Sequence, residues 1–117
     1  MNLKPVPFTI AIDNREQQPY SFGLATVEPL GYSSVRTITT YLPTGDYSIV
    51  GLEGRFAVER KSLEDLYATL GQGRSRFEAE FQRLNAMDFA AIVIEADLRD
   101  VWRPADARPG WKSRLRP

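Results

Sequence analysis

The feature that most restricts the fold is a pair of β-prone runs joined by a short, glycine-bounded loop. Residues 46–50 and 55–61 carry Tyr, Ile, Val and Phe between polar side chains, and Gly51-Leu52-Glu53-Gly54 separates them. This pattern predicts a β-hairpin. The loop fixes the register, so Asp46 is expected directly opposite Glu59 on one face of the hairpin.

The remaining elements follow from hydrophobic periodicity and turn residues. The sequence predicts strands over residues 8–13, 35–42 and 89–94, helices over 63–70 and 75–87, and an irregular connection over 14–33. A Ser-x-x-acid capping pattern introduces each helix, at Ser62 and at Ser75. The last strand is continuously apolar, which is typical of a strand buried on both faces. The order of elements predicts an α/β domain with a mixed β-sheet flanked by helices.

Composition excludes several kinds of chemistry. The chain has 117 residues, 15 Lys and Arg against 15 Asp and Glu, and neither histidine nor cysteine. Disulfide frameworks, zinc fingers, thiolate nucleophiles and Ser-His-Asp triads are therefore ruled out. The sequence also lacks a long apolar segment and a secretion signal, so we expect a soluble, intracellular (cytoplasmic) protein with no membrane partner.

Zero net charge argues against a nucleic-acid partner, but the charge is unevenly distributed. Residues 99–117 contain six cations and two anions, whereas residues 1–54 contain three cations and five anions. We therefore divide the chain into a main domain, residues 1–97, and a basic, proline-containing segment, residues 98–117.

The hairpin carries the residues that predict chemistry. Period two places Lys61 on the same face as Asp46 and Glu59. Two opposed carboxylates repel each other, and a divalent cation such as Mg²⁺ reverses that effect. With a lysine nearby, the set suits metal-assisted hydrolysis of a phosphodiester. Taken alone, the three residues are better explained as a turn aspartate and a solvated Glu-Lys pair; Asp13, a third acid at a strand end, favours the chemical interpretation.

Three blocks together resemble the xeroderma pigmentosum group F (XPF) nuclease family. They are Asp13-Asn14-Arg15-Glu16, Leu42-Pro43-Thr44-Gly45-Asp46-Tyr47 and Glu59-Arg60-Lys61-Ser62-Leu63-Glu64-Asp65. The family motif is Gly-Asp, a variable gap, Glu-Arg-Lys, three residues and Asp. The resemblance runs from about Ile10 to Glu95 and implies the PD-(D/E)XK, restriction-endonuclease-like fold.

The resemblance also implies roles for individual residues. Asp46 and Glu59 match the ligands of Mg²⁺ or Mn²⁺, Lys61 matches the catalytic lysine, and Asp13 matches a further member of the metal site. Arg15, Glu16 and Arg60 match residues that shape the active site and contact the scissile phosphate. By alternation, however, Arg60 points away from Glu59, so a buried ion pair explains it equally well. Glu16 could simply cover Arg15.

Other candidate residues have structural explanations beside the functional ones. Ser62-x-x-Asp65 explains Asp65 as part of a helix cap, which we favour. Arg74 and Arg76 follow a glycine-flanked loop that suits contact with a DNA backbone, although a plain helix-helix link is the commoner case. Trp102 and Trp111 could stack on bases, but packing against the domain is the preferred interpretation.

These observations together predict a metal-dependent DNA endonuclease, acting in repair or recombination on branched, nicked or single-stranded DNA. The alternative is a non-catalytic DNA-binding or partner-pairing module on the same fold. The family's domain continues with a further helix and strand that help form its dimer interface, whereas this chain ends about twenty residues after the last strand. It is therefore expected to be either a fragment or a minimal member from a bacterium, an archaeon or a phage. Homodimerisation or pairing with a partner subunit is left open.

Overall fold

The computed structural model describes residues 2–102, which form one five-stranded sheet in the order β2-β1-β3-β4-β5. The strands are β1 (Lys4–Asp13), β2 (Tyr32–Thr40), β3 (Tyr47–Ile49), β4 (Phe56–Ser62) and β5 (Phe89–Glu95). The β1–β2 and β4–β5 pairs are parallel, whereas β3 runs antiparallel to both β1 and β4. The predicted mixed sheet is thus confirmed.

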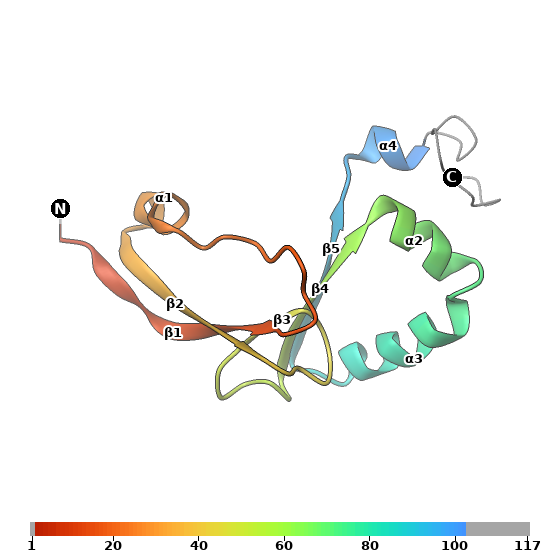
Figure 1. Ribbon diagram of the computed structural model, residues 1–117, viewed down its shortest axis with the longest axis horizontal. Coiled ribbons are helices and arrows are strands. Elements are labelled where there is room, and N and C mark those ends of the chain that lie inside the picture. Colours follow the sequence, from red (N-terminus) through yellow and green to blue (C-terminus); the bar gives the residue numbers. More distant parts are fainter. Residues whose placement is uncertain (1, 103–117) are drawn as a thin grey trace.

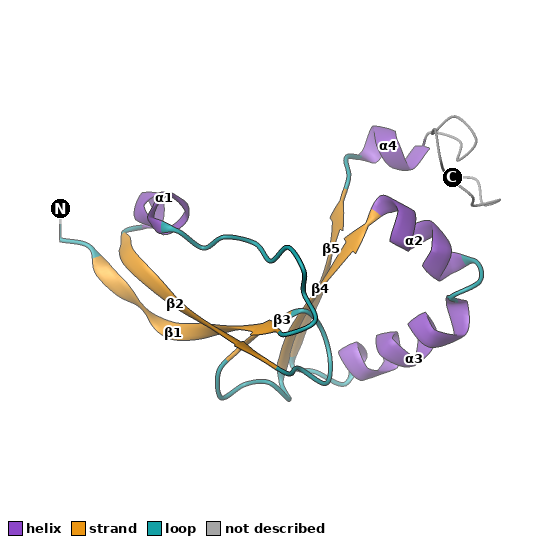
Figure 2. Ribbon diagram, viewed as in Figure 1, coloured by secondary structure: helices purple, strands orange, loops and turns teal. Residues whose placement is uncertain are grey.

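The helices lie at the two ends of this sheet (Figures 1 and 2). Two of them, α2 (Leu63–Leu70) and α3 (Arg74–Asn85), follow β4 and lead back to β5. The short α4 (Leu98–Trp102) comes after β5. The connection after β1 was expected to be irregular, but it contains the one-turn helix α1 (Leu24–Val27) and the 3₁₀ turn η1 (Glu28–Leu30), which pack beside β2.

The hairpin has the predicted register. Tyr47 pairs with Val58, so the neighbouring pair in the same register is Asp46 and Glu59. At the start of the hairpin, Gly45 has φ = +80°, a left-handed conformation that favours glycine. A Cβ added there would lie 3.1 Å from the Cβ of Ala57 and 3.2 Å from the carbonyl oxygen of Val58. Glycine therefore allows the chain to approach β4 closely, immediately before Asp46.

One of the two predicted helix starts is correct. Ser62 is the N-cap of α2, and its hydroxyl accepts a hydrogen bond of 3.1 Å from the main-chain N–H of Asp65. The capping role predicted for Ser75 is wrong, because α3 already begins at Arg74 with Gly73 as its N-cap. The N–H of Gly73 donates to the carbonyl of Ala68 at 2.8 Å. This tight reversal after α2 lets the next helix start earlier than the side-chain pattern indicates.

The core lies where the central strands meet α2 and α3. Its buried apolar side chains include Ala11, Ile12, Leu42, Tyr47, Ala57, Leu63, Tyr67 and Leu84. The expectation that β5 is buried on both faces is wrong: 52% of Phe89 and 40% of Ile94 is exposed. The reason is topological, because β5 forms an edge of the described sheet and pairs only with β4.

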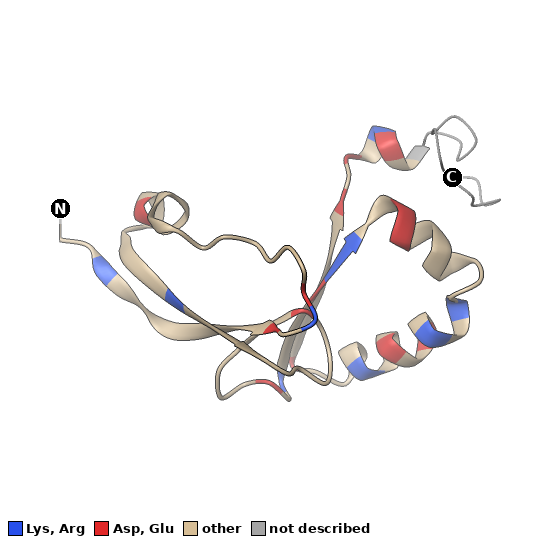
Figure 3. Ribbon diagram, in the orientation of Figure 1, with Lys and Arg blue, Asp and Glu red and all other residues tan. Residues whose placement is uncertain are grey.

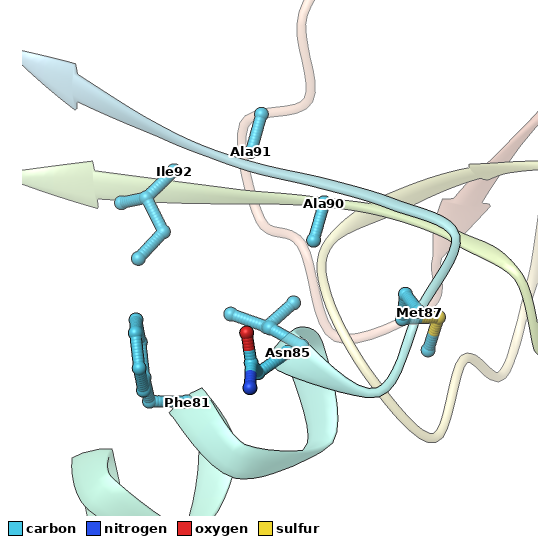
Figure 4. A pocket seen from close by; sticks show the side chains of 7 residues that line it. Phe81, Asn85, Met87, Ala90, Ala91 and Ile92 are labelled. Carbon is cyan, nitrogen blue, oxygen red and sulfur yellow. The ribbon is translucent and has the colours of Figure 1, made fainter.

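An apolar pocket of about 350 Å³ lies between α3 and β5 (Figure 4). Phe81, Leu84 and Ile92 line it, and it contains none of the predicted site residues. Among residues 2–102, no helix is long and apolar enough to cross a membrane.

Candidate active site

Asp46 is fixed between β1 and β4 by its main chain and its side chain. Its N–H donates to the carbonyl of Val58 at 2.8 Å, and its own carbonyl accepts from the N–H of Asp13 at 2.8 Å. The carboxylate oxygen Oδ2 accepts from the main-chain N–H of Arg60 at 2.7 Å. These three bonds link Asp46 to both neighbouring strands and leave little freedom in its orientation.

Glu59 lies opposite Asp46 on β4 and is buried, with 9% of its surface exposed. Lys61 follows two residues later on the same face, where its Nζ lies 5.7 Å from the centre of the Phe77 ring on α3. The structure therefore brings together the predicted pair of acids and the predicted lysine. Each of the three side chains interacts with a residue of α3.

Burial and mutual repulsion disturb the ionisation of the two acids. Burial raises the pKa of Asp46 to about 6, and the charges of Glu16 and Glu80 add to the rise, although the hydrogen bond from the Arg60 N–H opposes it. The pKa of Glu59 is raised further, by burial, by a hydrogen bond with Glu80 and by the charge of Asp46. Lys61 offsets only part of this effect. The two acids therefore release their protons at higher pH than exposed carboxyl groups do.

Glu80 is a site residue that the sequence interpretation missed. It lies on α3 at the helical spacing that also brings Phe77 and Leu84 toward the sheet, and its side chain meets that of Glu59. A glutamate on the inward, otherwise apolar stripe of a helix is costly to bury. Its position on that stripe was the signal that could have identified it.

The acid pair suits Mg²⁺ or Mn²⁺ in its chemistry. Both ions prefer hard oxygen ligands, and Mg²⁺ is commonly held by one or two carboxylates, waters and substrate phosphate. Within residues 2–102, no group of three or more acidic side chains has the geometry of a complete metal site. Asp46 and Glu59 would supply two of the ligands, and water or phosphate would complete the coordination. The raised pKa values of the pair fit this role, because a divalent cation would displace the protons that the two acids hold.

Asp13 and Arg15 lie beside this pair but are engaged with the chain. The Asp13 carboxylate accepts from the N–H of Leu42 at 2.9 Å and from Nε of Arg15 at 2.8 Å. Although burial opposes ionisation, these bonds hold the pKa of Asp13 below its ordinary value. Arg15 also donates to the carbonyl of Leu42 at 2.8 Å. Membership of Asp13 in a metal site, and the catalytic role of Arg15, stay predictions.

Glu16 links Arg60 to the acid pair, because it pairs with the Arg60 guanidinium and its side chain also hydrogen-bonds to Asp46. Arg60 forms ion pairs with Glu95 at 3.0 Å and with Glu16 at 3.2 Å, and its guanidinium lies over the ring of Tyr20. Of the two explanations that the sequence left open, the ion pair is the one present in the structure. A phosphate contact by Arg60 stays a prediction. Glu16 pairs with Arg60, whereas the expected cover of Arg15 is supplied by Asp13.

The arginines after the glycine loop have different surroundings. Arg74 is exposed and pairs with Glu78 one turn later, at 3.0 Å. Arg76 lines a groove of about 440 Å³ between α2 and α3 that also contains Lys61 and Glu80. Positive and negative residues alternate along α3 and gather where the end of β1 meets β4 (Figure 3). Arg76 is therefore the nearer of the two arginines to the acid pair, and DNA binding by both stays a prediction.

Three sequence candidates remain, Trp102, Trp111 and Asp65. The side chain of Trp102 and all of Trp111 lie outside the described residues. Asp65 supplies the N–H that Ser62 caps, as the helix-cap interpretation requires.

Comparison with known proteins agrees with this geometry. The family model of the ERCC4 domain matches residues 12–115. Among solved structures, XPF from Aeropyrum pernix is similar, with 29% sequence identity and a TM-score of 0.53. That match covers 76% of this chain and 38% of the Aeropyrum chain, so this chain spans well under half of that structure's length. Comparison with curated proteins found no match. The chain has an XPF-type nuclease fold and belongs to the ERCC4 domain family, a nuclease family of DNA repair.

Proposed function

We propose that this protein is a metal-dependent endonuclease that hydrolyses phosphodiester bonds of DNA. The observation that carries the proposal is the opposition of Asp46, the residue before β3, and Glu59 of β4, with Lys61 on the same face. Such a set is costly in an apo fold because its negative charge is partly buried. It becomes favourable when a divalent cation and a phosphate occupy the site together.

Each residue has a separate part in this proposal. Asp46 and Glu59 would hold Mg²⁺ or Mn²⁺, with Asp13 as the further member that the family resemblance implies. When bound, such a metal lowers the pKa of water and stabilises negative charge on a phosphoryl oxygen. Lys61 would orient the attacking water or neutralise charge that develops on the phosphate.

The arginines would bind the rest of the DNA. Arg76 lies in the groove beside Lys61, and Arg74 lies at the exposed start of the same helix. Contacts with the phosphate backbone position a nucleic acid without reading its sequence. A preference for branched, nicked or single-stranded DNA therefore fits this site better than a preference for a base sequence, and a role in repair or recombination follows from it. A homodimer or a partner subunit is part of the same proposal.

The test is cleavage of labelled single-stranded, nicked and branched DNA with Mg²⁺, with Mn²⁺ and with EDTA. We expect cleavage with either metal and none in EDTA, and loss of cleavage in Asp46→Asn and Glu59→Gln. Asp88→Asn and Glu64→Gln are matched controls, because both replace exposed acids outside the site. Cleavage that persists in EDTA or in Asp46→Asn would contradict the mechanism. DNA binding without cleavage under every divalent metal would favour the non-catalytic module.

A further inference from the structure

The guanidinium of Arg60 is enclosed by side chains beside the acid pair, and one of them, Glu16, also hydrogen-bonds to Asp46. Nε lies 3.0 Å from Oε1 of Glu95, and one terminal nitrogen lies 3.2 Å from Oε2 of Glu16. The same nitrogen donates to the carbonyl of Gln18. The ring of Tyr20 closes the enclosure, 4.3 Å from the guanidinium carbon. Only 20% of the Arg60 side chain is exposed.

The main chain of Arg60 bonds directly to the acid pair. Its N–H donates to Oδ2 of Asp46 at 2.7 Å, and its two neighbours in sequence are Glu59 and Lys61. One residue thus connects the ion-pair network of its side chain to the three predicted active-site residues through its main chain. Any shift of Arg60 along or out of the strand would move the N–H that orients Asp46.

Tyr20 and Glu95 strengthen this connection. The Tyr20 hydroxyl donates to Oε2 of Glu95 at 3.2 Å, so both oxygens of that carboxylate are engaged. The Tyr20 ring stacks on the Tyr47 ring, with 5.4 Å between ring centres. The main-chain N–H of Tyr20 donates to the Tyr47 hydroxyl at 2.8 Å. Tyr47 is the residue directly after Asp46. The network therefore contacts the residue that follows each acid, Tyr47 after Asp46 and Arg60 after Glu59.

We propose that Arg60, Glu95 and Tyr20 form a positioning clamp that sets the orientation of Asp46, and that Arg60 acts through this clamp and not as a phosphate contact. The inference rests on the proposed function for its consequence in metal binding. Two carboxylates flank the guanidinium, and their negative charge repels a phosphate. To bind one, Arg60 would have to break both ion pairs.

The test compares two variants of the clamp with a matched control. Glu95→Gln removes the charge that holds Arg60, and Tyr20→Phe removes only the hydroxyl that donates to Glu95. Asp88→Asn is the control, because it breaks an exposed pair with Arg55, 2.6 Å long, at the opposite end of the same two strands. Thermal unfolding of each variant shows whether it is folded. If Glu95→Gln does not fold, Tyr20→Phe still tests the clamp.

Three measurements are made on each folded variant. Hydrogen exchange of the Arg60 amide, followed by NMR without metal, reports its bond to Asp46. Titration with Mn²⁺ in the absence of DNA reports the orientation of the carboxylates. DNA affinity at several salt concentrations reports phosphate contacts, and Arg60→Gln is included in this series.

We expect the clamp variants to speed exchange of the Arg60 amide and to weaken Mn²⁺ binding about tenfold, as for other groups that orient metal ligands. DNA affinity and its salt dependence should be unchanged, and Asp88→Asn should match the wild type throughout. Unchanged amide exchange in both clamp variants overturns the proposal. So does a salt slope reduced by about one in Arg60→Gln, which indicates a phosphate contact. If the wild type binds no Mn²⁺, the proposed function fails, whereas amide exchange still decides whether the clamp exists.

Discussion

The side chains of Asp13 and Arg15 bind the main-chain N–H and the main-chain carbonyl of the same residue, Leu42. Asp13 accepts from the N–H of Leu42 at 2.9 Å, Arg15 donates to its carbonyl at 2.8 Å, and the two side chains pair with each other at 2.8 Å. Leu42 is fully buried. It precedes the turn that leads to Asp46, so the pair anchors the approach to the acid site.

This anchor predicts a graded response to substitution of Asp13. Asp13→Ala should lower the free energy of unfolding by about 2–3 kcal/mol, because it leaves the buried N–H of Leu42 without its acceptor. Asp13→Asn keeps an acceptor oxygen and should cost less. Urea denaturation measures both, with Glu64→Gln as the control. Mn²⁺ titration of folded Asp13→Asn separates the roles: a large loss of affinity would support membership of Asp13 in the metal site.

Gly45 predicts a second effect on stability. Gly45→Ala places a Cβ in a left-handed conformation and against β4, 3.1 Å from the Cβ of Ala57. It should destabilise the protein by about 1–3 kcal/mol and disturb Asp46. Gly54→Ala is the control, because its φ is not left-handed and a Cβ there meets nothing within 4 Å. Equal unfolding free energies for the two variants would show that the turn tolerates a side chain.

The ionisation of the acid pair predicts an unusual pH dependence. Because folding raises the pKa of Asp46 from 3.8 to about 6, and that of Glu59 as well, the native state binds protons more tightly than the unfolded state. Stability of the metal-free protein should therefore fall as pH rises from about 4 to about 6 through Asp46, and should continue to fall toward about pH 9 through Glu59. Asp13 and Glu95 have lowered pKa values, so the stability that they contribute is lost only at more acidic pH.

Thermal unfolding across this pH range measures the effect. Asp46→Asn should reduce the fall, since it removes one of the two responsible groups. Saturating Mn²⁺ should raise the melting temperature more at about pH 7.5 than at about pH 5, because protons compete with the metal. A metal-free protein whose stability rises steadily across the same range would contradict this account.

Glu80 predicts opposite effects with and without metal. Glu80→Gln should raise the melting temperature of the metal-free protein, because it removes a negative charge beside Glu59. It should also weaken Mn²⁺ binding, since the same charge attracts the cation. Glu78→Gln, on the exposed side of α3, should change metal affinity little. Identical Mn²⁺ titrations for the two variants would remove Glu80 from the site.

Lys61 predicts a loss of rate without a loss of binding. Lys61→Met should lower single-turnover cleavage by about 10²-fold or more, the scale of one proton-transfer or charge-stabilising group. Mn²⁺ affinity should not fall, because the change removes a positive charge from beside the metal ligands. Lys4→Met, at the exposed start of β1, is the control. If cleavage is retained in Lys61→Met, another group must assist the attacking water.

Local sequence patterns were sufficient for the elements whose contacts are close along the chain. Strand alternation and a short glycine-bounded loop fix the hairpin and its register, and these alone put Asp46, Glu59 and Lys61 on one face. The cap at Ser62 is equally local, because its partner is three residues away. These predictions succeeded because strand period, turn length and capping involve neighbours in the chain.

Tertiary packing was needed for everything that depends on distant segments. The partners of Arg60, Glu16 and Glu95, lie 44 and 35 positions away, and α3 brings Glu80 to Glu59 from a helix further along the chain. The exposure of β5 depends on its place at the edge of the described sheet and not on its apolar sequence. The periodicity of a sequence predicts which face of a helix or strand a side chain occupies. Only the packing of one element on another determines which charge or surface that face meets.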